Sequence, residues 1–317
     1  MMGLKDIGPS IAVAGHLVYD EIVFPSGKSE VSLGGISYNI AALCAMMRKG
    51  RLYCVCRIGS DRKAEFDRIF EHCPVLDNSL IKTADKLNVV NRLVYSTNGS
   101  REEWNSRIPE PISLQAIPAE IDALLMNFIS GDDVLTDDLD MFRRRFDGVI
   151  YLDYHSLALG HNPDGSRFYR YNKKWMEYVS AADILQLNAA ELFSIVGQSE
   201  SVPEAIAVQC RMLHEQGPGA IIVTMGNRGA VISGESGERK YFIPPLNIVR
   251  EMDSTGCGDT LAAVTLYNYL ISGDILSSAI EGSRWATAKA TFSGLQGFSS
   301  IQEILDRIGP SPKLIVL

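Results

Sequence analysis

The sequence lacks several features by which large classes of protein are recognised. Its 317 residues contain no run of 18 consecutive apolar residues, so no transmembrane helix and no membrane partner are expected. The first ten residues lack the basic-then-apolar pattern of a secretion signal, which favours a cytoplasmic protein. The formal net charge is −8, and basic residues cluster only at 143–145, a run that we interpret as an exposed helix face. Because nucleic-acid binding needs a basic face, no nucleic-acid partner is expected.

Paired cysteine motifs are also missing. The chain has six cysteines, none in a CxxC pair and none with a histidine at zinc-ligand spacing: Cys44, Cys54, Cys56, Cys73, Cys210 and Cys257. This pattern disfavours a structural zinc site. We therefore expect reduced and mostly buried thiols.

Common nucleotide-binding and catalytic motifs are incomplete or absent. Residues 27–29 (Gly-Lys-Ser) look like the end of a P-loop, but Ile22 stands where the first glycine belongs. Residues 256–258 (Gly-Cys-Gly) begin like a dinucleotide fingerprint, but Leu261 replaces its third glycine. No GxSxG or HExxH motif occurs. These absences disfavour dehydrogenases, serine hydrolases and metalloproteases.

What the sequence does contain is an alternation of short apolar runs with helical patterns. Strands are predicted at 11–14, 52–58, 123–129, 148–152, 184–187 and 220–224. Helices are predicted at 37–48, 62–71, 139–146, from 189 onward, 203–215, 258–271 and 275–292. Such alternation predicts an α/β fold with a mostly parallel sheet and helices on both of its faces.

Two segments of the N-terminal third depart from this rhythm. Residues 20–34 and 87–105 alternate polar and apolar side chains, as exposed antiparallel strands do. They form either one small sheet beside the main domain or two irregular surface hairpins. We favour the first interpretation, and expect the whole chain, 1–317, to be one domain with a small β lid that exposes apolar residues such as Ile22 and Val89.

The strongest functional signal is residues 253–259, Asp-Ser-Thr-Gly-Cys-Gly-Asp, which open a predicted helix. Two glycines let backbone N–H groups approach a ligand, and the N-terminus of a helix favours phosphate. Asp259 falls in the first helical turn. It is either a residue that caps the helix or a base that faces a bound phosphate.

This segment resembles the C-terminal signature of the ribokinase-like (PfkB-type) carbohydrate and nucleoside kinases, which usually reads Asp-Thr-Thr-Gly-Ala-Gly-Asp. Further motifs resemble that family and occur in its order: Gly15 with Asp20; Leu33-Gly34-Gly35 with Asn39 and Ala41; Asn188 with Glu191; and Thr224 with Gly226 and Gly229. One departure is Leu43, where many sugar kinases of the family carry lysine.

The resemblance implies a ribokinase-like three-layer αβα sandwich and a function. That function is transfer of the γ-phosphate of ATP to a hydroxymethyl group of a sugar or nucleoside. The alternative is an inactive kinase-fold protein that binds a sugar or nucleotide as a regulator, which the retention of Asp259 disfavours. Because relatives often pair their lids, a homodimer through the lid is expected.

Roles on the donor side follow from the resemblance. The backbone of Gly256, Cys257 and Gly258 would form an anion hole, and Asp259 would accept the proton of the acceptor hydroxyl. Nucleotide binding is expected at Asn188, Thr224, Gly226, Gly229 and Thr255. Asn188 and Glu191 share a helix face and would hold Mg²⁺ through water, unless they are only a helix cap with a surface glutamate. A monovalent cation such as K⁺ is expected near Asp253 and the loop at 293–299.

The acceptor side is expected to include Asp20, Gly34, Gly35, Asn39, Asp153, His155 and Arg101. His155 could touch substrate or phosphate, or be a histidine satisfied at the rim of the site. Arg101 could meet an anionic group of the acceptor, or be an ordinary surface arginine. In open parallel sheets ligands bind beyond the carboxyl ends of the strands, and Gly15, Asp153, Asn188 and Gly226 each follow such an end.

Overall fold

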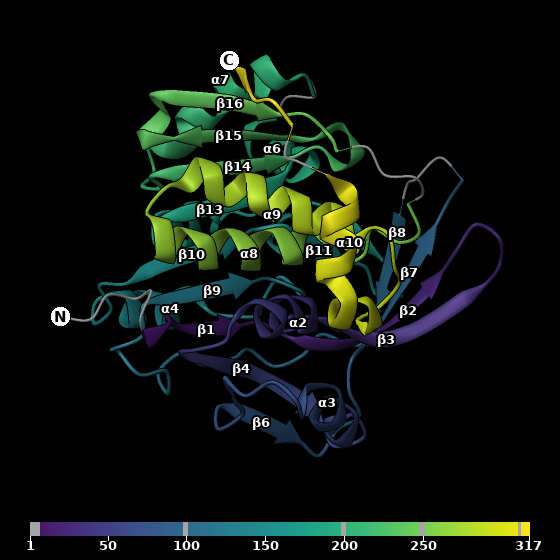
Figure 1. Cartoon of the computed structure of the whole chain (residues 1–317). Helices are drawn as coiled ribbons and strands as arrows, with labels where there is room; N and C mark the ends of the chain where they lie inside the picture. The colour runs from purple at the N-terminus through teal and green to yellow at the C-terminus, as the bar shows by residue number, and fades with distance from the viewer. Residues whose placement is uncertain (1–6, 98–100, 198–200, 247–250, 310–311) are drawn as a thin grey trace.

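A sheet of eleven strands forms the middle layer of the computed structural model, which describes residues 7–97, 101–197, 201–246, 251–309 and 312–317 (Figure 1). The strands are, in sheet order, β17 (Ile315–Val316), β16 (Arg239–Ile243), β15 (Ala230–Gly234), β14 (Ala220–Thr224), β13 (Ile184–Asn188), β10 (Val149–Asp153), β9 (Ala123–Asn127), β1 (Ser10–Ala14), β4 (Arg51–Gly59) and β5 (Leu76–Asp77), with β6 (Ile81–Ala84) also paired to β4. Pairing is parallel from β4 to β14 and antiparallel from β14 to β17.

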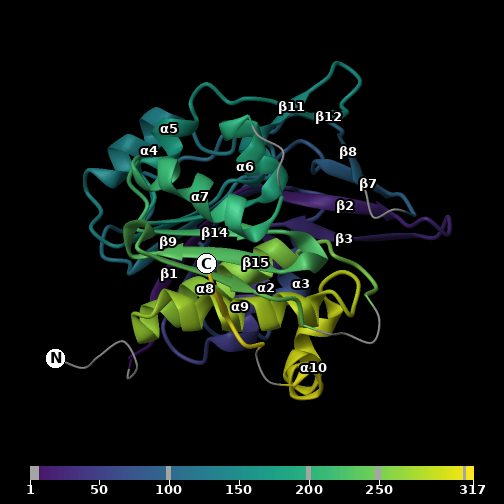
Figure 2. The same ribbon diagram turned by 90° about the horizontal axis from the view of Figure 1, so that it is seen from above.

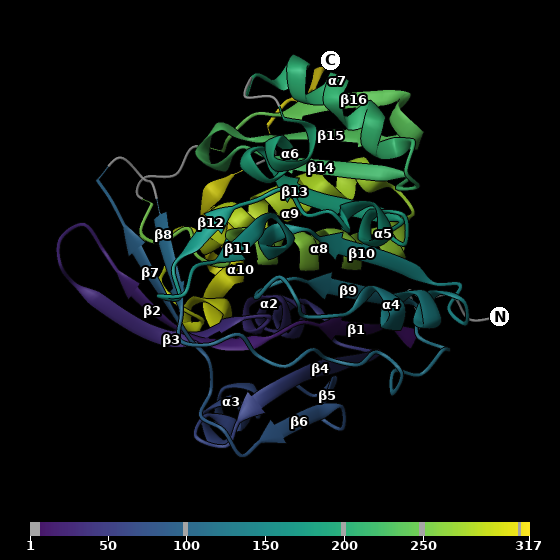
Figure 3. The ribbon, with the colours of Figure 1, turned by 180° about the vertical axis from the view of Figure 1, so that it is seen from behind.

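Helices cover both faces of this sheet. One face carries α2 (Ser37–Met46), α8 (Cys257–Ser272), α9 (Ile275–Lys289) and α10 (Ile301–Ile308) (Figure 1). The other carries α4 (Thr136–Arg143), α5 (Trp175–Val179), α6 (Ala189–Val196) and α7 (Pro203–His214), as the view from behind shows (Figure 3). Figure 2 shows the three layers from above. Neighbouring strand residues such as Leu124 and Leu125 enter different buried clusters, because successive side chains point to opposite faces. The predicted αβα sandwich is confirmed.

The remaining helix, α3 (Lys63–Phe70), lies at the β4 end of the sheet (Figure 1). Predicted and observed elements agree to within one to three residues at most ends, and β14 agrees at both. The prediction missed the antiparallel strands β15, β16 and β17. Among the described residues, no helix combines the length and apolar character needed to cross a bilayer.

The basic run at 143–145 is not simply an exposed helix face. Arg143 donates to both carboxylate oxygens of Asp183, at 3.2 and 3.0 Å. Arg145 donates to backbone carbonyls within 114–117. Only Arg144 pairs within its own helix, with Asp140. Two of the three arginines therefore tie α4 and the turn that follows it to neighbouring loops.

The two irregular N-terminal segments form one four-stranded sheet, here called the lid sheet. Its order is β3 (Ser29–Gly35), β2 (Leu17–Val23), β7 (Val90–Tyr95) and β8 (Arg101–Asn105). The two hairpins are antiparallel, but β2 pairs with β7 in parallel, which the sequence did not predict. Residues 98–100 of the predicted lid lie outside the described residues. The expected exposure of Ile22 and Val89 is wrong, because both are buried, at 1% and 4% exposed.

The lid sheet continues directly from the main sheet, since only Gly15 and His16 separate β1 from β2. A Cβ atom at Gly15 would lie 2.3 Å from the carbonyl oxygen of Asn127, so this close approach requires glycine. His16 is buried, and its Nδ1 lies 2.9 Å from Asp133 Oδ1. Burial opposes a charge on His16, but Asp133 outweighs it and raises the pKa of the imidazole. The junction is therefore held by a buried ion pair.

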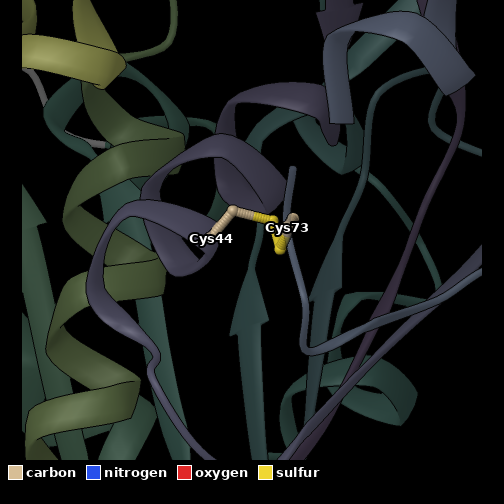
Figure 4. The surroundings of a disulfide bond; sticks show 2 residues. All are labelled: Cys44 and Cys73. Carbon is tan, nitrogen blue, oxygen red and sulfur yellow. A yellow bond between two sulfur atoms is a disulfide. The ribbon is translucent and has the colours of Figure 1, made fainter. Parts of the chain in front are cut away.

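Not all cysteines are reduced. Cys44 of α2 and Cys73, in the turn after α3, form a disulfide with their Cα atoms 5.4 Å apart (Figure 4). The expectation of free thiols is wrong for this pair, because packing brings together two residues 29 positions apart that no local spacing motif connects. Cys54, Cys56 and Cys210 are free and buried, as expected.

Candidate active site

The segment 253–259 forms a tight turn into α8. Gly256 has φ +81°, and a Cβ atom there would lie 2.3 Å from the ring of Tyr38, so glycine is required on two counts. The Thr255 N–H donates to Asp253 Oδ1 at 2.9 Å and closes the turn. The first N–H groups of a helix have no intrahelical acceptor and can bind an anion, although that of Cys257 donates to the Ser254 carbonyl oxygen at 3.2 Å. We call residues 255–258 the anion loop.

Asp259 is held from two other elements. Asn127, at the end of β9, donates its side-chain amide to Asp259 Oδ1 and to Asn39 Oδ1. Asn39 of α2 in turn donates to the carbonyl oxygen of Asp259 at 2.9 Å. Burial raises the pKa of Asp259, although His155 and Asn127 oppose the shift. A raised pKa makes this carboxylate a stronger base than a solvated aspartate.

Sequence reasoning missed Asn127 and Gln186, both of which contact the predicted catalytic segment. Gln186 of β13 donates to Asp153 Oδ2 and to the carbonyl oxygen of Gly258, each at 3.0 Å. Asp153 is only 5% exposed, and burial raises its pKa well above the usual range. Asp153 is thus tied through Gln186 to the anion loop. Asn127 ends the observed strand β9, but the predicted strand ran on to residue 129, so the rule that singled out Asp153 passed over it.

Asn188 and Glu191 form a capping box at the start of α6. Asn188 Oδ1 accepts from the Glu191 N–H at 2.9 Å, and Glu191 Oε2 accepts from the Asn188 N–H at 2.8 Å. Glu191 Oε1 also lies 3.3 Å from His155 Nδ1. If the pair only capped the helix, Glu191 was expected at the protein surface, but its side chain is 2% exposed. The cap is present, and its glutamate is buried inside the site.

His155 is the partner of this buried carboxylate. Burial opposes a charge on the ring, but Glu191, Glu103 and Asp153 outweigh it and raise the pKa of His155 to about 9. The residue also has φ +24°, a region that non-glycine residues rarely adopt. His155 therefore places a positive charge beside Asp153 and Glu191. This goes beyond the purely structural role of a hydrogen-bonded histidine at the rim of the site.

On the acceptor side, Asp20 projects from β2 and is 2% exposed. Its Oδ1 accepts from the side-chain amide of Asn91 in β7 at 3.2 Å. A Cβ atom at Gly34 would lie 1.9 Å from Asp20 Oδ2, so the glycine makes room for this carboxylate. Gly35 has φ +59°, where the chain turns into α2. Burial raises the pKa of Asp20 to about 7.

The lid sheet reaches the anion loop. The hydroxyl groups of Tyr95, the last residue of β7, and Thr255 lie 2.8 Å apart. Arg101 of β8 pairs with Glu103 of the same strand, so its charge is already neutralised within the lid. Burial opposes ionisation of Glu103, but Arg101, His155 and Arg167 lower its pKa. Arg101 is therefore neither a free anion ligand nor an unpaired surface residue.

A short hairpin that the sequence did not predict widens the lid sheet. It consists of β11 (Leu159–His161) and β12 (Arg167–Tyr169), and Ser166 bridges to Trp104 of β8. Arg167 donates to Asn105 Oδ1 at 2.8 Å. Hairpin and lid sheet lie together at one end of the molecule (Figure 3). The lid is thus formed by three chain segments rather than two.

The predicted nucleotide residues lie on the neighbouring strand. Thr224 ends β14 in register with Asn188 of β13. Gly226 and Gly229 have φ +60° and +103°, and the Met225 N–H donates to the Gly229 carbonyl at 2.8 Å to close a turn. Thr224, Gly226 and Gly229 therefore continue the rim on which Asn188 lies.

The cation expected near Asp253 does not fit. The Lys289 ammonium group lies 3.6 Å from Asp253 Oδ2 and occupies the position beside it. The described residues also contain no group of three or more histidine, cysteine or acidic side chains suited to a protein-bound metal. A metal at this site would have to be carried mainly by the phosphates of a donor.

Known proteins match this chain at the region that carries the anion loop. Residues 162–302 fit the model of the pfkB family carbohydrate kinases. The chain is a carbohydrate or nucleoside kinase, a phosphotransferase similar to the ribokinase-like (PfkB) kinases.

Two curated proteins are similar to this ribokinase-like kinase over most of their length. A cytidine kinase of Thermococcus kodakarensis is 24% identical over 275 residues, which is 82% of this chain and 88% of the relative. A nucleoside kinase of Methanothermobacter thermautotrophicus is 22% identical over 305 residues, 89% and 88% of the two chains.

Solved structures share the fold at lower identity. A pyrophosphate-dependent kinase in the ribokinase family has a TM-score of 0.77 at 15% identity, covering 92% of this chain and 99% of its own. Arabidopsis thaliana ribokinase, solved with ribose and ATP, has a TM-score of 0.72 at 16% identity, covering 94% and 99%. Within this fold, Asp153, Asn188 and Thr224 end the neighbouring strands β10, β13 and β14, and Asp20 and Arg101 lie on the lid sheet.

Proposed function

We propose that this ribokinase-like kinase transfers the terminal phosphoryl group of ATP to a primary hydroxyl group of a sugar or nucleoside. The observation that carries the proposal is the position of Asp259, half-buried in the first turn of α8 and oriented by Asn127 and Asn39. A residue that only capped the helix would not need these contacts from β9 and α2.

In the reaction, Asp259 accepts the proton of the acceptor hydroxyl as the oxygen bonds to phosphorus. The N–H groups of Gly256 and Gly258 stabilise the charge that develops on the transferred group, whereas that of Cys257 is bonded to Ser254. His155 adds a positive charge at the same rim. Closure of the lid sheet, through Tyr95 and Thr255, excludes the water that would otherwise accept the phosphoryl group.

The donor lies along the ends of β13 and β14, beside Asn188, Thr224, Gly226 and Gly229. Mg²⁺ carried by its phosphates neutralises charge when bound. The side chains of Asn188 and Glu191 bond each other, but Asn188 is partly exposed whereas Glu191 is buried, so Asn188 is the better placed of the two to contact the water shell of the ion. Glu191 then fixes the orientation of Asn188.

The acceptor lies between the lid sheet and α2. Asp20 offers a carboxylate, and Asn91 offers an amide group, that can bond vicinal hydroxyls. Asn39, expected among the acceptor ligands, is fully buried and bonded to Asn127 and Asp259, so it positions Asp259 instead. A ribose ring, free or within a nucleoside, has such a pair of hydroxyls. Similarity to the cytidine and nucleoside kinases supports a nucleoside, and similarity in fold to ribokinase supports the free sugar.

We further propose that the lid sheet pairs with that of a second copy in a homodimer. The support is limited to the outer strand β3, where Val31 is 58% exposed. An uncovered strand edge with an apolar side chain is a surface that proteins usually cover.

The test is a coupled assay of ADP release with cytidine, other nucleosides, ribose, deoxyribose and myo-inositol as acceptors. We expect one acceptor to support turnover with ATP, and Asp259→Asn to abolish it. A parallel series replaces ATP by pyrophosphate and measures phosphate release. Turnover with pyrophosphate alone would refute ATP as the donor, and no turnover with either donor would contradict the proposed function.

A further inference from the structure

Lys289, the last residue of α9, has a fully buried side chain, at 0% exposed. Its Nζ donates to the carbonyl oxygen of Phe292 at 3.0 Å, and lies 3.4 Å from the carbonyl oxygen and 3.6 Å from Oδ2 of Asp253. An ammonium group in a protein interior is costly unless it is paired and hydrogen-bonded. Three oxygen atoms match the three donors that an ammonium group has.

Two aromatic rings complete this environment, which we call the cation cage (Lys289 with Asp253, Phe292 and Tyr38). Nζ lies 5.4 Å from the ring centre of Tyr38 and 5.1 Å from that of Phe292, within the range of cation–π attraction. Tyr38 is the same ring that lies against Gly256. The cage is thus in direct contact with the anion loop.

The cage fixes the chain that leads into the anion loop. Asp253 Oδ1 accepts from the Thr255 N–H, Ser293 donates to Oδ2 at 3.3 Å, and the Asp253 N–H donates to the Ala290 carbonyl at 3.2 Å. Lys289 donates a hydrogen bond to the carbonyl oxygen of Asp253 and forms an ion pair with its carboxylate. Movement of the ammonium group would therefore move Thr255 and the amides that follow it.

The charge of Lys289 also acts on the loop itself. Burial raises the pKa of the Cys257 thiol to about 12, and Lys289 opposes that shift. A positive charge behind the anion loop favours a phosphoryl group in front of it.

We propose that the Lys289 ammonium is a built-in cation that positions the anion loop and makes phosphoryl transfer independent of any bound monovalent cation. The inference rests on the proposed phosphoryl transfer at the anion loop. It differs from a purely stabilising role, such as the bonds that lysines often make to the last carbonyls of a helix. A stabilising role predicts loss of stability alone, whereas a positioning role predicts activity that an added cation restores.

The first measurement uses the wild-type protein in choline, sodium, potassium and ammonium chloride at equal ionic strength. We expect kcat to agree to within about twofold in all four salts, because the ammonium group of Lys289 already fills the cage. Activation by potassium or ammonium of more than about threefold would overturn the proposal.

The second measurement uses Lys289→Ala, with Lys82→Ala on the exposed side of β6 as the matched control. In choline we expect kcat of Lys289→Ala to fall by about 10- to 100-fold, with partial recovery in potassium, ammonium or methylammonium chloride. Lys82→Ala should keep wild-type kcat in every salt. Wild-type kcat of Lys289→Ala in choline, or a loss that none of these cations reverses, would refute the inference.

A third measurement needs no turnover, and so separates this inference from the proposed function. Potassium or ammonium, compared with choline, should raise the thermal midpoint of Lys289→Ala by about 2–5 °C and leave the wild type unchanged. An equal response of both proteins would overturn the cation cage even if no acceptor were ever found. If Lys289→Ala does not fold, the wild-type salt series decides.

Discussion

The donor side and the acceptor side of the site are built in different ways. On the donor side, function lies in backbone amides and glycine turns at the start of α8 and the end of β14. On the acceptor side, it lies in side chains of the lid sheet, such as the buried Asp20 and the half-buried Asn91. The family model matches 162–302, which holds most of the donor side, and not the lid sheet. The chemistry is therefore easier to recognise than the acceptor.

The sharpest test of this contrast is Asp259→Asn, which removes the base without changing the backbone of the anion loop. We expect kcat to fall by about 10²- to 10⁴-fold with little change in ATP affinity, measured by ADP release and nucleotide titration. Asparagine caps helices as well as aspartate does, so a purely structural Asp259 would tolerate the change. The control is Asp274→Asn, at the N-cap of α9, which should be silent. Retention of kcat to within about threefold would remove Asp259 from the mechanism.

On the acceptor side, Asp20→Asn should raise the KM for the acceptor by about 10- to 100-fold and change kcat less, because it weakens charged hydrogen bonds to hydroxyls. With a pKa of about 7, Asp20 gains a proton as the pH falls, so wild-type kcat/KM should decline below pH 7. Asp20→Asn should lack that decline. Asp140→Asn on the surface of α4 is the control, and an unchanged acceptor KM in Asp20→Asn would exclude Asp20 from binding.

Between the two sides lies His155, whose pKa is raised to about 9. The interactions that raise the pKa of His155 stabilise the fold in full below pH 6.5, the pKa of the residue in the unfolded chain. This contribution is lost as the pH rises through about 9, the pKa in the folded protein. We expect the free energy of unfolding to fall by roughly 2 kcal/mol across this window relative to His155→Gln. Denaturant titrations at several pH values measure it, with His72→Gln, an exposed histidine, as control. Parallel pH curves for wild type and His155→Gln would contradict the imidazolium.

The smallest expected effect is that of Tyr95→Phe, which removes the contact between the lid sheet and Thr255. Loss of one hydrogen bond should lower kcat/KM for the acceptor by about 3- to 10-fold. Tyr53→Phe loses a comparable bond from Arg51, outside the site, and should leave kcat/KM unchanged. If the two variants behave alike, the hydroxyl of Tyr95 has no part in closing the lid.

Much of the fold and the donor side could be predicted from sequence because they depend on local patterns. The apolar run at 220–224 predicts a strand, and the glycines before α8 predict a turn, from their own residue types alone. Asn127, Gln186 and Lys289 could not be assigned in this way. Each has a partner in a segment far away in the chain, which no local pattern reveals. The disulfide between Cys44 and Cys73 escaped prediction for the same reason.

The direct passage from β1 into β2 gives the lid the mechanics of a lever. Gly15 and His16 are the fulcrum, and the seven residues of β2 are the arm. At about 3.3 Å per residue the arm is about 23 Å long, so a rotation of about 10° at the fulcrum moves its tip by about 4 Å. The ion pair of His16 and Asp133 lies at the point of least displacement, where a stiff contact limits the motion least. A small twist at the end of β1 would thereby be amplified into a larger movement of the lid sheet.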